Sequence, residues 1–101
     1  MDKDDINIET EDKNVVLVVA DTLTALHLPM YGYERQTSPF MEKLADENLI
    51  FENAYSNAPW TVPSHASLFS GKLMSEHGTG TGDSMFRDHS FVQDINQKGY
   101  N

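Results

Sequence analysis

Residues 14–20, NVVLVVA, begin with Asn14 and continue as an unbroken run of apolar and mainly β-branched side chains. A strand with one solvated face alternates polar and apolar residues, whereas an unbroken apolar run predicts a strand buried on both faces. Such strands belong to parallel sheets that helices cover on both sides. The run therefore predicts an α/β fold, with Asp21 and Thr22 directly after the carboxyl end of the strand.

A helix and a second strand are predicted further along the chain. Ser38 is a suitable N-cap, Pro39 suits the first helical position, and the apolar residues that follow share roughly one face. The stretch NLIFENAY then predicts a strand over residues 49–55. Since strand, helix and strand make one βαβ unit, we expect parallel strands joined by a right-handed crossover.

The other segments are predicted to be loops and short helices. Residues 23–37 are expected to be irregular, and a short helix is expected over about 62–70, closed by Gly71. A loop is predicted over 75–89, in which the stretch GTGTG is expected to be flexible and two histidines could be solvated. A last helix should follow, with Gly99 as its C-cap.

The predicted sheet has only two strands and open edges. The chain stops at Tyr100-Asn101, where a third strand would begin. We therefore expect residues 14–101 to be the incomplete N-terminal portion of a larger domain.

The charge of the chain excludes some classes of partner. It has 101 residues, with 16 acidic against 7 basic side chains and a net charge of −9. Residues 1–13 are predicted to be a disordered acidic tail, because they carry Asp2, Asp4, Asp5, Glu9, Glu11 and Asp12. A protein with this excess of negative charge repels nucleic acid and anionic lipid, so neither is expected as a partner.

The sequence contains no cysteine, which excludes a disulfide framework and a thiolate metal site. Its acidic start does not resemble a secretory signal. The longest apolar run, 15–20, is too short to cross a bilayer. We expect a cytoplasmic protein.

Asp21 is the first candidate site residue. Open α/β sheets bind ligands at the carboxyl ends of their strands, and a carboxylate there suits a divalent cation. The alternative is an aspartate that closes an Asx-type turn after the strand.

The stretch NAPWTVPSHASLFSGK (57–72) holds the other candidates. Thr61 could cap the helix, or it could present its hydroxyl to an anion at the helix N-terminus. His65 lies one turn later and could donate a hydrogen bond to that hydroxyl or to a substrate oxygen, or it could be an ordinary polar residue. Lys72 could reach an anionic substrate or only complement the helix dipole.

Taken together, these blocks resemble the sulfatase family of the alkaline-phosphatase superfamily. The resemblance is carried by NVVLVVADT, by YGYERQTSPFMEKLADENLIFENAYS and by TVPSHASLFSGK followed by SEHG, and it covers about residues 14–101. It implies an αβα sandwich, a divalent cation (Ca²⁺, Mg²⁺ or Mn²⁺) held in part by Asp21 and Thr61, and a small anionic ester as substrate.

The sequence departs from the family signature in three places. Thr61 stands where sulfatases have a Cys or Ser that becomes formylglycine, and threonine cannot give that aldehyde. Thr22 replaces a second acidic ligand, and His65 replaces the signature arginine. Thr61 resembles instead the branches that transfer or hydrolyse phosphoryl groups with an unmodified threonine.

The resemblance implies metal-assisted, in-line attack by Thr61, with His65 as a second catalytic residue and Lys72 binding substrate. Cleavage of a sulfate, phosphate or phosphonate ester is expected of a longer form. The alternative is a non-catalytic remnant or anion-binding module. Because the remaining metal ligands are missing from residues 1–101, we expect this chain alone to be inactive.

Overall fold

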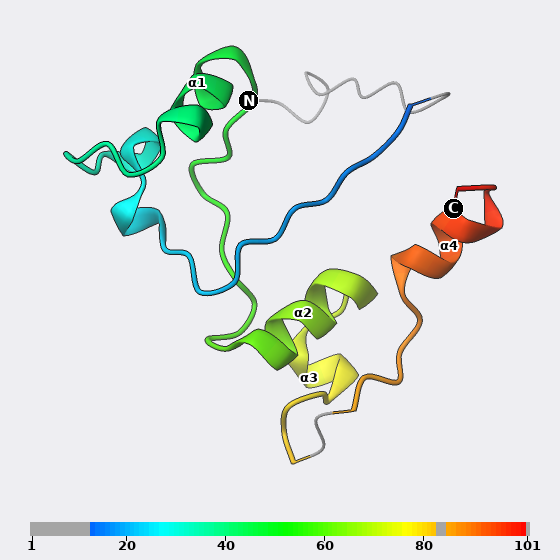
Figure 1. Ribbon diagram of the computed structural model, residues 1–101. Coiled ribbons are helices and arrows are strands. Elements are labelled where there is room, and N and C mark those ends of the chain that lie inside the picture. The colour runs from blue at the N-terminus through cyan, green and yellow to red at the C-terminus, as the bar shows by residue number, and fades with distance from the viewer. Residues whose placement is uncertain (1–12, 83–84, 101) are drawn as a thin grey trace.

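Helices are the only regular elements that the computed structural model shows in residues 13–82 and 85–100, the part of the chain that it describes (Figure 1). Four are α-helices and two are single 3₁₀ turns. In chain order they are η2 (Ala25–His27), η3 (Pro29–Tyr31), α1 (Pro39–Glu47), α2 (Thr61–Ser70), α3 (Met74–His77) and α4 (Phe91–Gln97). The predicted acidic tail, apart from Lys13, lies outside the described residues.

The two predicted strands are wrong in this structure. Residues 13–20 and 49–55 contain no strand, and so the expected right-handed βαβ crossover is also missing from the described residues. A β-strand exists only where a neighbouring strand exchanges hydrogen bonds with it. The segment 13–20 starts far from the segment that follows α1 and nears it only toward its end, and no ladder joins them (Figure 1).

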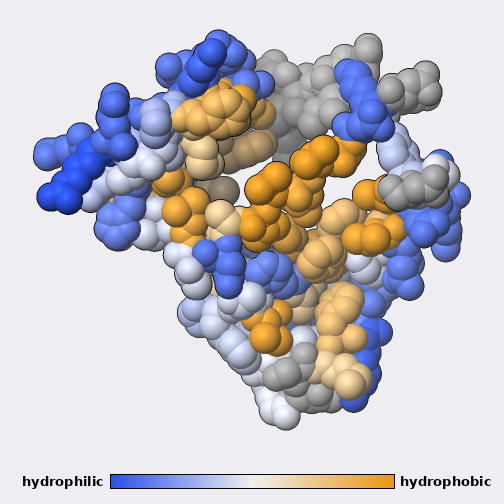
Figure 2. Space-filling model, in the orientation of Figure 1, coloured by the Kyte–Doolittle hydropathy of each residue, from blue (hydrophilic) through white to orange (hydrophobic). Residues whose placement is uncertain are grey.

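The apolar run that should be buried is therefore exposed. Val15 is 71% exposed and Val16 is 84% exposed, and Leu17 is also exposed. Figure 2 shows hydrophobic surface gathered in the middle of this face of the molecule. The prediction of a strand buried on both faces is wrong here because no helix layer covers residues 13–20.

The predicted helices are confirmed, but the predicted C-cap of the last one is wrong, because α4 (Phe91–Gln97) has Lys98 and not Gly99 at that position. α1 begins after Ser38 with Pro39 at its first position. α2 ends at Gly71, whose φ of 70° suits the left-handed C-cap that glycine adopts without strain. Ser90 caps α4, because its hydroxyl accepts a hydrogen bond from the Val92 N–H at 3.2 Å.

The predicted loop 75–89 is wrong at its start, where α3 forms. The Leu73 N–H donates a hydrogen bond to Glu76 Oε2 at 2.7 Å, which satisfies a backbone donor at the start of this short helix. The prediction missed α3 because four residues give too little hydrophobic periodicity to read.

The helices lie in two groups. One group contains η2, η3 and α1, and the other contains α2, α3 and α4 (Figure 1). Phe69 of α2 stacks on Phe91 of α4 with 5.5 Å between the ring centroids. The buried residues among those described are few, namely Leu28, Ala58, Pro63, Ala66, Ser67 and Thr79. None of the described helices has the length and apolar character that a membrane span needs.

Candidate active site

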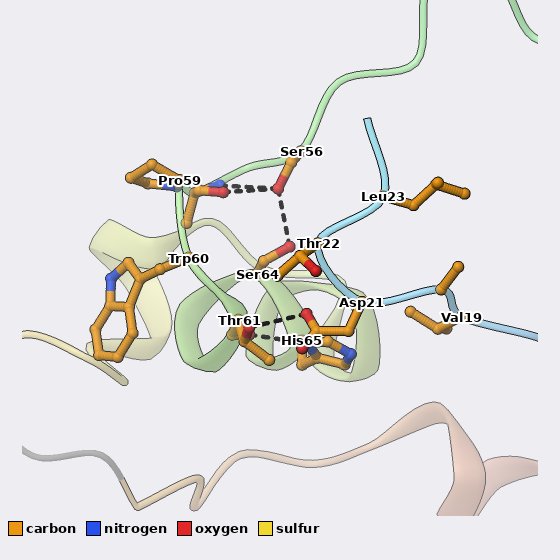
Figure 3. A pocket seen from close by; sticks show the side chains of 12 residues that line it. Val19, Asp21, Thr22, Leu23, Ser56, Pro59, Trp60, Thr61, Ser64 and His65 are labelled. Carbon is orange, nitrogen blue, oxygen red and sulfur yellow. Dashed lines mark hydrogen bonds between the residues drawn. The ribbon is translucent and has the colours of Figure 1, made fainter. Parts of the chain in front are cut away.

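Asp21 and Thr61 lie 40 residues apart in the sequence and meet in the structure. Thr61 Oγ1 donates a hydrogen bond to Asp21 Oδ1 at 2.9 Å (Figure 3). Asp21 comes from the turn that follows the extended segment 13–20, and Thr61 is the first residue of α2. The two candidate residues that the sequence placed on different elements therefore face each other.

Thr61 is not the N-cap of α2. That position belongs to Trp60, whose backbone is extended, and no side chain forms a capping hydrogen bond there. The first helical hydrogen bond runs from the Ser64 N–H to the Trp60 carbonyl at 3.3 Å. The capping interpretation of Thr61 is thus wrong, because its hydroxyl donates its proton to a carboxylate instead of accepting one from the helix.

A left-handed residue follows Asp21. Thr22 has a φ of 60°, the one positive φ among the non-glycine residues that the structure describes. A left-handed conformation costs an L-residue roughly 1–2 kcal/mol, and β-branched side chains tolerate it poorly. The Leu23 N–H donates to the Ala20 carbonyl at 3.4 Å and closes the turn. This turn directs Asp21 toward α2.

His65 lies one turn after Thr61, as its spacing predicts. Its Nδ1 is 2.9 Å from the Thr61 carbonyl oxygen. Because a carbonyl only accepts, Nδ1 carries the proton and donates, and the neutral ring has its lone pair on Nε2. His65 therefore contacts the backbone of Thr61, whereas the sequence suggested that it could donate to the hydroxyl or to a substrate oxygen.

Two serines that the sequence analysis did not single out also line the site. The Ser56 hydroxyl donates to the Ala58 carbonyl at 2.7 Å, and its oxygen lies 2.8 Å from Ser64 Oγ. Since Ser56 has only one proton to give, Ser64 is the donor between them. The position of Ser64, three residues after Thr61, was the available signal for a shared helix face.

These residues surround a cleft of about 400 Å³. Figure 3 shows the segment around Asp21 on one side of it and the first turn of α2 on the other. The walls are both apolar and polar, and the lining residues include Val19, Leu23, Trp60, Thr22, Ser56 and Ser64. A cleft of this size accommodates a small ester.

Lys72 lies at the opposite end of α2 from Thr61. A ten-residue helix spans about 15 Å, so the structure does not bring the two residues together. Lys72 Nζ donates to Asp88 Oδ1 at 2.6 Å. This hydrogen bond, and then the charge of Asp88, raises the pKa of Lys72 above its usual 10.5. A role in substrate binding stays a prediction.

The site supplies only some of the ligands that a divalent cation needs. The Asp21 carboxylate and the Thr61 hydroxyl are the oxygen ligands that hard divalent cations take, but such cations take six or more. Among residues 13–82 and 85–100, no group of three or more His, Asp or Glu side chains could hold a metal ion. The two oxygens can therefore supply two ligands, and other groups have to complete the shell.

The two histidines of the predicted loop 75–89 both have hydrogen-bond partners. His77 is the last residue of α3, and its Nε2 lies 2.9 Å from Ser67 Oγ. His89 Nε2 lies 2.7 Å from Asp94 Oδ1 on α4. Neither histidine lines the cleft between Asp21 and Thr61.

Comparison with known proteins identifies the family. The family model described as Sulfatase matches residues 13–101. An N-acetylglucosamine-6-O-sulfatase of Bacteroides thetaiotaomicron is 29% identical over 94 residues, which are 91% of this chain and 17% of the relative. The human N-acetylgalactosamine-6-sulfatase is 32% identical over 82 residues, which are 81% of this chain and 16% of the relative.

An arylsulfatase of Clostridium perfringens is 29% identical over 90 residues, which are 86% of this chain and 19% of the relative. The chain thus spans less than a fifth of the length of these relatives. No solved structure matches it. Since the family model covers nearly the whole sequence, the chain belongs to the sulfatase family.

Proposed function

We propose that the chain carries the nucleophile of a sulfatase-type hydrolase, and that Thr61 attacks the phosphorus or sulfur of a small anionic ester. The observation that carries the proposal is the 2.9 Å hydrogen bond from Thr61 Oγ1 to Asp21 Oδ1 at the start of α2. The names of the relatives support hydrolysis of an ester, because each of them is a sulfatase.

The first step uses the direction of this hydrogen bond. The Thr61 hydroxyl donates its proton to Asp21, so its lone pairs are left for the substrate. The N–H groups of Thr61 and Val62 precede the first helical hydrogen bond, and such groups favour an anion at a helix N-terminus. A divalent cation, when bound, would lower the pKa of the hydroxyl and neutralise charge on the transferring group.

In-line attack then forms a bond from Thr61 Oγ1 to phosphorus or sulfur as the bond to the leaving oxygen breaks. Water afterwards hydrolyses the ester on Thr61 and releases the inorganic anion. His65 is suited to this second step, because the lone pair on Nε2 can accept a proton from water while Nδ1 stays bound to the Thr61 carbonyl.

The side chain of Thr61 favours phosphoryl transfer over the chemistry of formylglycine. Its β-carbon carries a methyl group, so oxidation cannot give the aldehyde on which formylglycine sulfatases depend. We therefore expect phosphate or phosphonate esters to be better substrates than sulfate esters. The chain's net charge of −9 argues against nucleic acids as substrates.

The test is a comparison of aryl esters, made on the polypeptide that the complete reading frame encodes. Activity should depend on a divalent cation, and an aryl phosphate or phosphonate should react faster than the matching aryl sulfate. Thr61→Ala should abolish the activity, and so should Thr61→Val, which keeps the branched shape without the hydroxyl. A preference for the sulfate, or activity in either variant, would overturn the proposal.

A second candidate function is an anion-binding module without catalysis. It is favoured because no group of three or more His, Cys, Asp or Glu side chains among the described residues could hold a metal ion. Both functions predict that orthovanadate binds at the start of α2. Turnover of an ester distinguishes them, because only the enzyme hydrolyses one. Binding that Thr61→Val leaves intact, together with no turnover of any ester, would support the module.

A further inference from the structure

His77 bridges α2 and the loop that follows α3. Its Nδ1 accepts a hydrogen bond from the Thr79 N–H at 3.0 Å. The proton of the neutral ring therefore lies on Nε2, which donates to Ser67 Oγ at 2.9 Å. Ser67 and Thr79 are only 4% and 3% exposed, so both ends of this bridge are buried.

The same tautomer excludes a second nucleophile here. A serine acts as a nucleophile when the histidine beside it can accept its proton. His77 Nε2 already carries a proton and donates it to Ser67, and the serine is buried away from solvent. The pair is therefore a structural link and not a catalytic dyad.

The bridged loop, residues 78–82, lies against the start of α2. A Cβ atom added at Gly80 would lie 3.1 Å from Trp60 Cζ2 and 3.2 Å from Pro63 Cδ. Trp60 and Pro63 stand on either side of Thr61, and Pro63 is fully buried. The side chains of Trp60, one residue before the proposed nucleophile, and of Pro63, two residues after it, thus leave no room for a side chain at Gly80.

We propose that loop 78–82 is a buttress for the first turn of α2, and that His77 is a positioning residue for Thr61. No side chain caps this turn, so packing helps to fix its direction together with the hydrogen bonds of Thr61 and Ser64. The Ser67–His77–Thr79 bridge holds the loop in place, and Gly80 lies close to the side chains of Trp60 and Pro63. The consequence for reactivity rests on the function proposed above, whereas the positioning itself does not.

Gly80→Ala tests the contact, and Gly32→Ala is its matched control. The two glycines have φ values of 94° and 97°, so alanine strains the backbone similarly at both. Only at Gly80 does the new methyl group meet other atoms, because nothing lies within 4 Å at Gly32. The readout is the NMR signals of the Thr61 methyl group, the Thr61 amide and the Trp60 indole in the 101-residue chain.

The buttress predicts that Gly80→Ala shifts these signals and that Gly32→Ala leaves them in place. Unmoved signals in Gly80→Ala, or equal shifts in both variants, would overturn it. Far-UV circular dichroism of each variant separates displacement of the turn from loss of the helix.

Variants of His77 test the bridge. His77→Asn can still accept the Thr79 N–H from within the loop, but its side chain is too short to reach Ser67. If the link to α2 matters, this variant should shift the Thr61 signals as far as His77→Ala does. Wild-type signals in His77→Asn would contradict the proposal, and so would a ring proton found on Nδ1 of the wild-type protein by ¹⁵N NMR.

Kinetics on the polypeptide of the complete reading frame then separate the two proposals. If Thr61 is the nucleophile, His77→Asn should lower kcat by about 10-fold to 100-fold with little change in KM, as misplaced catalytic groups do. An active Thr61→Ala variant would overturn the proposed function but would not affect the conclusion from the NMR signals. Unchanged kcat and unmoved signals in His77→Asn would overturn only the proposal that loop 78–82 and His77 position Thr61.

Discussion

Thr61 differs from an ordinary helix-starting threonine in the direction of its hydrogen bond. A capping hydroxyl accepts a proton from its own helix, whereas Thr61 Oγ1 gives its proton to Asp21. The sequence could nominate both residues, because each stands at an element end where ligands bind. It could not show that they meet, because a contact across 40 residues depends on how the intervening chain folds.

Thr22 provides a prediction at the same scale. Replacing it with glycine should remove the cost of about 1–2 kcal/mol for an L-residue at a φ of 60°. The greater freedom of glycine in the unfolded chain should offset roughly 0.5–1 kcal/mol of that gain. The urea midpoint followed by circular dichroism should therefore rise slightly in Thr22→Gly.

The control is Thr22→Val, which keeps the branched side chain and the strain, and it should leave the midpoint unchanged. A lower midpoint in Thr22→Gly would show that the turn carries no strain to release.

At the scale of elements, the sequence predicted α1, α2 and α4 but missed the four-residue α3, and the two strands that it predicted did not form. The ends of α1 and α2 follow from Pro39 and Gly71, which act within a few residues. A strand depends on partners far away in the sequence, and the segment 13–20 has none in the part of the chain that the structure describes. The sulfatase family implies an alkaline-phosphatase-like α/β fold, so the apolar run retains a strand's composition without a strand's hydrogen bonds.

Two serines at helix starts give a matched pair of variants. Ser90 accepts a hydrogen bond from the Val92 N–H, whereas Ser38 Oγ is buried without a partner among the described residues. Ser90→Ala should therefore lower the free energy of unfolding by about 1 kcal/mol. Ser38→Ala should be neutral or stabilising, because it removes an unsatisfied polar atom. Urea titrations of both variants make the comparison, and equal losses would contradict it.

The ion pair between Lys72 and Asp88 should make stability depend on alkaline pH. The pair raises the pKa of Lys72 above 10.5, so its contribution is complete below that pH and is lost as the pH rises through the folded-state value. Urea midpoints should fall more between pH 10 and 12 in the wild type than in Lys72→Met. High salt should reduce the difference, because both side chains are partly exposed. If the urea midpoints of the wild type and of Lys72→Met changed equally with pH, the ion pair would not contribute to stability.

At the scale of the molecule, the chain is less compact than a folded domain of the same number of residues. Its radius of gyration is 16.3 Å, against about 13 Å for a compact domain of 100 residues. Its accessible surface is 8847 Å², against about 5,800 Å² for a folded protein of this mass. Little apolar area is removed from water, so the hydrophobic contribution to stability is small.

This openness predicts weakly cooperative unfolding of the 101-residue chain. The group of η2, η3 and α1 and the group of α2, α3 and α4 contact mainly within themselves, so each can unfold without exposing much of the other. Thermal melts should be broad, and NMR signals of Leu28 and Ala66, one buried residue in each group, should disappear at different temperatures. The calorimetric enthalpy should also exceed the van't Hoff enthalpy. A single sharp transition at high temperature, the same for both signals, would show that the two groups form one cooperative unit.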